Sequence, residues 1–227
     1  MYKRVLSLLF MLTLVNSVAT AGVMVGGTRI IFYGDKKETS ISVTNPDNNI
    51  WLIQSWVESP DKNKAPFVFS PPLFRLDSQQ KNILRLMYTG TPLPQNRESL
   101  FWANIKSIPH AEEAENVLQI AIKTQIKLIW RPAGLEKILP RTAMTKLSWR
   151  WQQGKLQVTN PTPYHMNFHS IAVNGKALTD PGWVAPFAVK EYSLPQPARV
   201  GKVSWRLIND YGAATQPFEA SVSTHEQ

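Results

Sequence analysis

The chain has 227 residues, a formal net charge of +9 and no cysteine. Its length fits one large domain or two ordinary ones. The absence of cysteine excludes disulfides, thiol nucleophiles and cysteine-based zinc sites, so packing alone must hold the fold together. The cations are scattered along the chain and form no Lys/Arg-rich block, which argues against a nucleic-acid partner.

The N-terminus has the three parts of a secretory signal peptide. A positively charged start precedes an apolar run over residues 5–15, and an A-x-A cleavage site ends at Ala21. The run is too short for a transmembrane helix, and no later stretch is apolar enough for membrane insertion. We predict a signal peptide over 1–21 with cleavage after Ala21. Its removal takes away Lys3 and Arg4, which lowers the formal charge from +9 to +7.

The first half of the exported chain reads as a series of short strands. Its prolines and recurring turn residues argue against a helical protein. Apolar-alternating runs lie at 28–33, 39–44, 50–57, 67–69, 73–76, 82–87 and 100–106. Strands at this spacing, with turn residues between them, predict a β-sandwich.

The longest alternating run covers 117–132. Its apolar face carries Leu118, Ile120, Ile122, Ile126, Leu128 and Trp130, and its polar face carries Gln119, Lys123, Gln125 and Lys127. This period of two predicts a long strand that ends at Pro132. One interpretation is an ordinary core strand with one face in water. The other is a strand that overruns its sheet, so that its first half offers apolar side chains and an unpaired edge to another protein.

A second set of strands follows a change in composition near residue 134. Residues 135–143 contain a proline and no clear alternation, which predicts a linker. Further alternating runs lie at 146–151, 155–159, 164–173, 188–194 and 202–208, with a hairpin signal at Asn174-Gly175. The sequence thus predicts an all-β protein of two sandwich domains, 22–134 and 144–227.

The residue types that carry catalysis or bind metals show no convincing pattern. His165 and His169 are four residues apart, but on a strand this spacing separates them too far to share a metal ion. The sequence has no G-x-S-x-G elbow and no glycine-rich phosphate loop. We therefore expect neither an enzyme nor a cofactor.

Seven segments in chain order carry a resemblance to a known family. They are TR at 28–29, NRESLFW at 96–102, IP at 108–109, NVLQIA at 116–121, IKLIWRP at 126–132, NPTPY at 160–164 and INDYG at 208–212. Together they resemble the periplasmic pilus-assembly chaperones of the chaperone–usher pathway. The short link after Ile108-Pro109 resembles the short-loop subfamily, which builds rod-like pili. The glycine-rich segment 22–27 departs from the family pattern, so the pairing of the first strand stays open.

The resemblance implies a fold, partners and two binding features. It implies two immunoglobulin-like domains in an L-shape, and a periplasmic chaperone that folds pilus subunits and delivers them to an outer-membrane usher. Arg29 and Lys127 would hold the C-terminal carboxylate of a subunit. Leu118, Ile120 and Ile122 would serve as the donor strand, which fills the open groove of a subunit that lacks its last strand.

The resemblance also implies a salt-bridge set between the domains, formed by Glu98, Arg131 and Asp210. From the residues alone, such a set would orient the domains and add little stability, because exposed ion pairs contribute only ~0–1 kcal/mol.

Two other functions remain open at this stage. The chain could itself be a pilus subunit or adhesin, although subunits usually have a cysteine pair and an N-terminal donor extension. It could also be a carbohydrate-binding sandwich with exposed tryptophans, although its eight tryptophans lie mostly within strand patterns. The sequence does not identify the cognate subunit, the usher, the adhesion target or any self-association.

Overall fold

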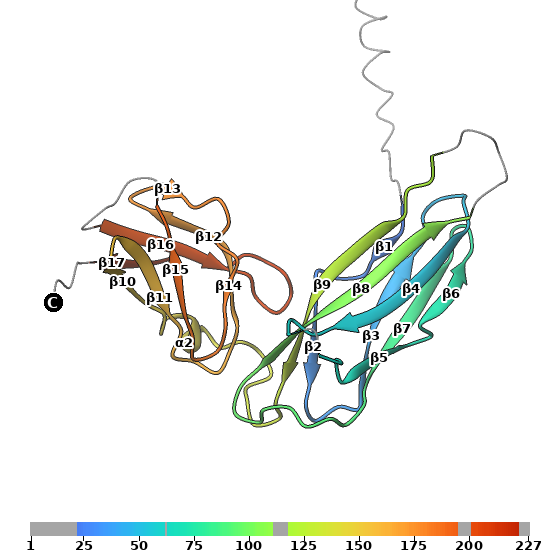
Figure 1. Ribbon diagram of the computed structural model, residues 1–227, viewed down its shortest axis with the longest axis horizontal. Coiled ribbons are helices and arrows are strands. Elements are labelled where there is room, and N and C mark those ends of the chain that lie inside the picture. Colours follow the sequence, from blue (N-terminus) through green and yellow to red (C-terminus); the bar gives the residue numbers. More distant parts are fainter. Residues whose placement is uncertain (1–21, 62, 111–117, 195–200, 223–227) are drawn as a thin grey trace, which may run out of the picture.

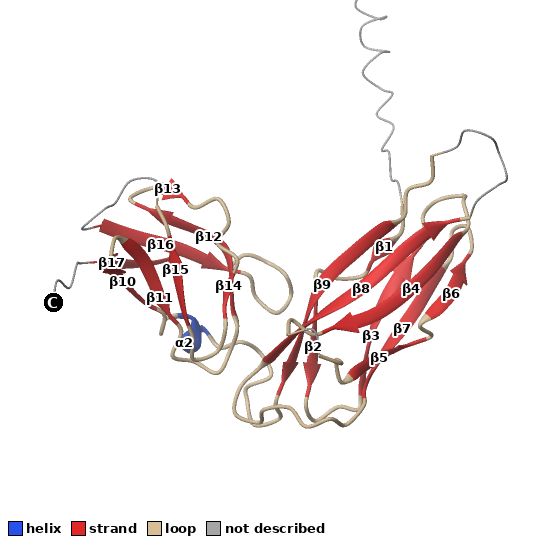
Figure 2. Ribbon diagram, viewed as in Figure 1, coloured by secondary structure: helices blue, strands red, loops and turns tan. Residues whose placement is uncertain are grey.

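The structure is a computed structural model that describes residues 22–61, 63–110, 118–194 and 201–222. The predicted signal peptide lies outside these residues. Strands dominate the described chain, whose one helix is the single turn α2 (Arg141–Met144), and no described helix has the length and apolarity to cross a membrane (Figure 2). The strands form two sandwiches that are inclined to each other (Figure 1). The predicted all-β class with two immunoglobulin-like sandwiches is confirmed.

The first sandwich packs a four-stranded sheet against a five-stranded one. The four-stranded sheet has the order β1 (Met24–Val25), β3 (Glu38–Thr44), β7 (Lys81–Tyr88), β5 (Phe67–Ser70). The five-stranded sheet has the order β2 (Arg29–Tyr33), β9 (Ile122–Arg131), β8 (Ser99–Pro109), β4 (Trp51–Glu58), β6 (Leu73–Leu76). Neighbouring strands are antiparallel except β2 and β9, which run parallel. Phe32, Leu86 and Leu128 are among the fully buried side chains between the sheets.

Two glycines let the N-terminal strand pass from one sheet to the other. β1 pairs with β3, whereas β2 pairs with β9 in the opposite sheet, and Gly26 and Gly27 lie between β1 and β2. A Cβ atom on Gly26 would lie 2.1 Å from the Ser42 hydroxyl oxygen and 3.2 Å from its carbonyl oxygen. A side chain at Gly26 therefore collides with β3. This crossing is the pairing that the sequence left open.

The second sandwich is built from a three-stranded and a five-stranded sheet. The three-stranded sheet has the order β10 (Ser148–Gln152), β11 (Lys155–Thr159), β15 (Val189–Tyr192). The other has the order β13 (Lys176–Ala177), β12 (Met166–Val173), β16 (Gly201–Leu207), β17 (Phe218–Val222), and β14 (Trp183–Val184) also pairs with β12. The sequence does not predict β13, β14 or β17. Two residues are too few to show a period, and β17 buries only its end residues, Phe218 and Val222.

Part of the segment predicted as a linker, 135–143, packs into the second sandwich. Leu139 and Ala143 are buried in its hydrophobic core, and Leu135 packs against that core. The segment shows no alternation because it ends in the one-turn helix α2, which begins directly after Pro140. The segment that connects the two sandwiches therefore packs against the second sandwich.

Candidate functional site at the junction of the two sandwiches

Arg29 and Lys127, the two predicted anion-binding cations, lie side by side. They are register partners on the parallel strands β2 and β9, so both side chains leave the same face of the sheet. Arg29 Nη1 donates a hydrogen bond to the carbonyl oxygen of Ile208 in the second sandwich, at 3.3 Å, and its buried Nε has no partner among the described residues. Burial lowers the pKa of Arg29, and the charge of Asp210 opposes this shift.

The Lys127 ammonium lies against two tryptophan rings, one from each sandwich. Its Nζ is 5.8 Å from the centroid of the Trp102 ring and 4.9 Å from that of Trp183. Burial, followed by the charges of Arg29 and Lys190, lowers the pKa of Lys127. Neither Lys127 nor Arg29 forms an ion pair with a carboxylate of the described residues. Two partly buried cations without paired carboxylates suit a ligand carboxylate.

Arg131 links the two sandwiches through two carboxylates. Its Nε donates to Glu98 Oε1 at 2.7 Å within the first sandwich. Its two terminal nitrogens donate to Asp210 of the second sandwich, at 2.7 and 2.9 Å. Asp210 also accepts the Leu139 backbone N–H at 2.8 Å. Burial alone would lower the pKa of Arg131, but hydrogen bonds and charges from Asp210 and Glu98 raise it above its ordinary value. The structure thus brings the predicted salt-bridge set together.

The expectation that these ion pairs are exposed is wrong. The side chains of Arg131, Glu98 and Asp210 are only 1%, 1% and 8% exposed. Charge patterns in a sequence do not reveal burial, and this set is covered because the two sandwiches close over it. Removing one partner of a buried ion pair typically costs ~3–5 kcal/mol, so the set matters for stability as well as for orientation.

The sequence also missed several contributors to the junction. The buried His165 donates its backbone N–H to Glu98 Oε2 at 2.6 Å, with its ring Nδ1 3.3 Å from the same oxygen. The Tyr164 ring lies 5.5 Å from the Arg131 guanidinium carbon. Tyr164 is the last residue of the NPTPY segment and His165 follows it, so this segment could have indicated both residues. Trp183 lies in no such segment, and nothing in the sequence pointed to it.

The three predicted donor residues are strongly exposed. The exposed fractions of Leu118, Ile120 and Ile122 are 83%, 62% and 48%. Further along the same run, Ile126, Leu128 and Trp130 are buried in the core of the first sandwich. Each interpretation of this run therefore applies to one half of it. The second half is a core strand, and the first half offers exposed apolar side chains.

The predicted strand over 117–132 is longer than the observed β9, which begins at Ile122. Val117 lies outside the described residues, and residues 118–121 are not in a strand. The reason lies in the neighbouring strands. β8 ends at Pro109, soon after its last pair with β9, Ser107 with Ile122. On the other side, β2 pairs with β9 only from Lys127 onward, so in the described structure residues 122–126 have an open edge.

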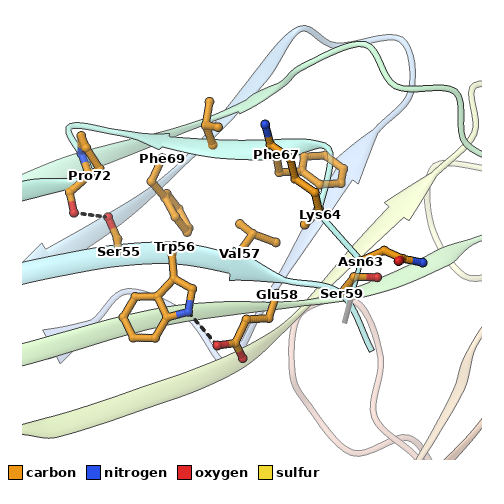
Figure 3. Close-up of a pocket in the computed structure, with 12 residues that line it drawn as sticks. Ser55, Trp56, Val57, Glu58, Ser59, Asn63, Lys64, Phe67, Phe69 and Pro72 are labelled. Carbon is orange, nitrogen blue, oxygen red and sulfur yellow. Dashed lines mark hydrogen bonds between the residues drawn. The ribbon is translucent and has the colours of Figure 1, made fainter. Parts of the chain in front are cut away.

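A separate hollow of about 750 Å³ lies beside β4 and β5 (Figure 3). Phe67 and Phe69 are buried at its apolar side. Trp56 Nε1 donates to the Glu58 carboxylate at 2.8 Å on its polar side. None of the junction cations lines this hollow. Across the described ranges, no group of three His, Asp or Glu side chains could hold a metal ion.

A bent pair of immunoglobulin-like sandwiches with an open strand edge and an unpaired cationic site defines a protein-binding module. The chain belongs to the pilus-assembly chaperones, which are folding and assembly factors and not enzymes. Residues 22–136 match the family described as pili and flagellar-assembly chaperone, PapD N-terminal domain. Residues 142–219 match the family described as pili assembly chaperone PapD, C-terminal domain.

Individual relatives agree with this assignment over nearly the whole chain. The probable fimbrial chaperone LpfB of Escherichia coli O157:H7 is 38% identical over 98% of both chains. The chaperone protein FimC of Escherichia coli K12 is 41% identical over 92% of this chain and 88% of its own.

Solved structures agree as well. The Salmonella enterica SafB chaperone, solved in complex with the SafA pilin, is 37% identical with a TM-score of 0.81, covering 90% of this chain and 98% of its own. The Escherichia coli chaperone DraB is 36% identical with a TM-score of 0.80, covering 89% and 97%. A pilus subunit or adhesin, the alternative that the sequence left open, is not favoured.

Proposed function

We propose that this chaperone completes the fold of a pilus subunit by donor-strand complementation. The observation that carries the proposal is the exposure of Leu118, Ile120 and Ile122 directly before the open edge of β9. On an extended strand, alternate side chains are ~6.6 Å apart and reach successive pockets of a groove. Burying each one contributes roughly 1.5–3 kcal/mol, so three side chains supply much of the binding free energy.

The second part of the proposal is that Arg29 and Lys127 bind the C-terminal carboxylate of the subunit. Their adjacent positions support this role, as does the fact that neither forms an ion pair with a carboxylate of the described ranges. Charge-assisted hydrogen bonds from two cations are stronger than neutral ones and constrain direction. The carboxylate therefore sets the register in which the subunit meets the donor residues.

We further propose the cellular setting of this activity. The signal peptide over 1–21 would direct the chain to the periplasm, with cleavage after Ala21. The domains would cover 22–134 and 144–227, close to the two family matches. After binding a subunit, the chaperone would deliver it to an outer-membrane usher. The SafB chaperone, solved with the SafA pilin, is a related case of a chaperone–subunit complex.

The test is co-expression in the periplasm with the fimbrial subunits of the same genome, followed by purification and mass spectrometry of the bound subunit. In a variant with Leu118, Ile120 and Ile122 all changed to threonine, subunit capture should be lost. Secretion and the melting temperature should stay nearly unchanged, because these side chains are exposed. A large fall in melting temperature, or undiminished capture, would contradict the donor-strand role.

A further inference from the structure

Trp183 lies at the junction but belongs to no segment of the family resemblance. It is a partly buried residue of β14 in the second sandwich, and its ring meets the Trp102 ring of the first sandwich edge to face, with centroids 5.7 Å apart. The Lys127 ammonium lies 4.9 Å from the Trp183 centroid, closer than to Trp102. The second sandwich therefore contacts Lys127 through Trp183, as it contacts Arg29 through the Ile208 carbonyl oxygen.

The type of contact matters for what Lys127 can do. A ring face attracts an ammonium through its quadrupole and accepts no conventional hydrogen bond. Lys127 also forms no ion pair with a described carboxylate, and the charge of Asp180 acts on it only from beyond ion-pair distance. An aspartate or glutamate in the place of Trp183 would compete with an incoming carboxylate, whereas an indole ring does not.

Lys190, the other cation at Trp183, is held differently. Its Nζ lies 5.9 Å from the Trp183 centroid and donates a hydrogen bond to the carbonyl oxygen of Pro181 at 3.1 Å. It also lies 5.2 Å from the centroid of the Tyr192 ring. Lys190 is thus tied to its own sandwich and adds positive potential to the site. Of the two lysines, Lys127 lies closer to the Trp183 ring.

We propose that Trp183 is a positioning residue for the carboxylate site. Its ring holds the Lys127 ammonium beside Arg29 in the unbound protein, so that a C-terminal carboxylate meets both cations already in place. This inference rests on the proposed function of Arg29 and Lys127. The carboxylate site is then formed by both sandwiches, so its affinity for a C-terminal carboxylate depends on how the second sandwich packs against the first.

Two substitutions at Trp183 distinguish the effect of the aromatic ring from the effect of apolar volume. Trp183→Leu keeps an apolar side chain and removes the ring, whereas Trp183→Phe keeps a ring face. Trp56→Leu is the matched control, because Lys123 Nζ lies 6.0 Å from the Trp56 centroid on the same face of the same sheet. Lys123 is four residues along β9 from Lys127, outside the carboxylate site.

The first readout is the preference for a free carboxylate. The probes are two 15-residue peptides with the C-terminal sequence of the subunit captured in the co-expression experiment, one ending in a carboxylate and one in an amide. The wild type should prefer the acid at least ~tenfold. Trp183→Leu should reduce that preference to about threefold or less, and Trp183→Phe and Trp56→Leu should keep it. In a Lys127→Ala background, Trp183→Leu should cause no further change in the preference.

The second readout is nuclear magnetic resonance of the unbound protein. Ring currents should move the ε-methylene protons of Lys127 upfield, Trp183→Leu should reverse most of this shift, and Trp56→Leu should leave it. Unmoved Lys127 signals in Trp183→Leu, or an equal loss of affinity for acid and amide, would overturn the inference. If the wild type itself shows no acid preference, the carboxylate site fails and the inference with it. The donor-strand role is judged separately by the threonine variant.

Discussion

At the scale of single residues, Arg29→Ala and Lys127→Ala should each sharply weaken subunit binding while the chain stays folded. The two cations share one face of adjacent strands, and losing one partner of a desolvated charged contact typically costs ~2–5 kcal/mol. The double variant should be little worse than either single one, because one remaining cation cannot hold the carboxylate in register. Calorimetric titration with a purified subunit measures these losses.

The control for this prediction is Lys176→Ala, which removes an exposed cation from β13 of the second sandwich. It should bind the subunit like the wild type, and circular dichroism should show all variants folded. If Arg29→Ala and Lys127→Ala weaken the binding of a subunit without its terminal carboxylate as much as that of the intact subunit, the carboxylate role of Arg29 and Lys127 is wrong.

The sequence indicated some residues of the site and not others, for a physical reason. Arg29 and Lys127 lie in segments that resemble a family, so their approach to one carboxylate could be expected, whereas their register on neighbouring strands came from the structure. Trp183 reaches Lys127 only through the packing of two sandwiches, and no local pattern encodes that contact. The burial of Arg131 was missed likewise, because its cover comes from the second sandwich.

At the scale of elements, the alternation of residues 118–130 predicted the buried side chains Ile126, Leu128 and Trp130 of β9, but not the burial of Ile129 on the opposite face. It could not predict where the strand begins, because that depends on where its neighbours stop. β8 ends at Pro109, which has no N–H to donate, and β2 starts opposite Lys127. The short strands β13 and β14 escaped prediction because they exist only through their pairing with β12.

The crossing of the N-terminal strand between sheets leads to a prediction about Gly26. Gly26→Ala should lower the free energy of unfolding by roughly 1–2 kcal/mol, because its Cβ atom would lie 2.1 Å from the Ser42 hydroxyl oxygen. Adding Ser42→Ala should recover part of the loss by removing that oxygen, while the Ser42 carbonyl oxygen at 3.2 Å stays. Urea denaturation of the single and double variants measures both effects.

Gly134→Ala is the matched control, because a Cβ atom there has no neighbour within 4 Å. It should be neutral, or stabilise by up to ~1 kcal/mol through the unfolded state. Equal destabilisation by Gly26→Ala and Gly134→Ala would show that the crowding at Ser42 is not the cause.

At the scale of the whole molecule, the two sandwiches are joined by contacts of several kinds. Arg131 forms ion pairs with Glu98 of the first sandwich and Asp210 of the second. Arg29 donates a hydrogen bond to the Ile208 carbonyl oxygen, and the Trp102 and Trp183 rings pack edge to face. Two of these contacts, Arg29 with Ile208 and Trp102 with Trp183, involve or adjoin the cations of the proposed carboxylate site. An arrangement that is fixed before binding keeps the cations in place, which reduces the ordering cost when a subunit binds.

Asp210→Ala should uncouple the two sandwiches. The carboxylate takes two hydrogen bonds from Arg131 and one from the Leu139 backbone. Its loss leaves the buried Arg131 with Glu98 as its one described carboxylate partner, beside the Lys137 carbonyl oxygen. The cost should be ~3–5 kcal/mol, as for other broken buried ion pairs. Because each sandwich has its own hydrophobic core, scanning calorimetry should show one unfolding transition for the wild type and two for Asp210→Ala. Asp35→Ala breaks the exposed ion pair with Lys137, at 3.4 Å, and should change the transition little. A wild-type-like transition in Asp210→Ala would show that the aromatic and backbone contacts hold the junction without Arg131.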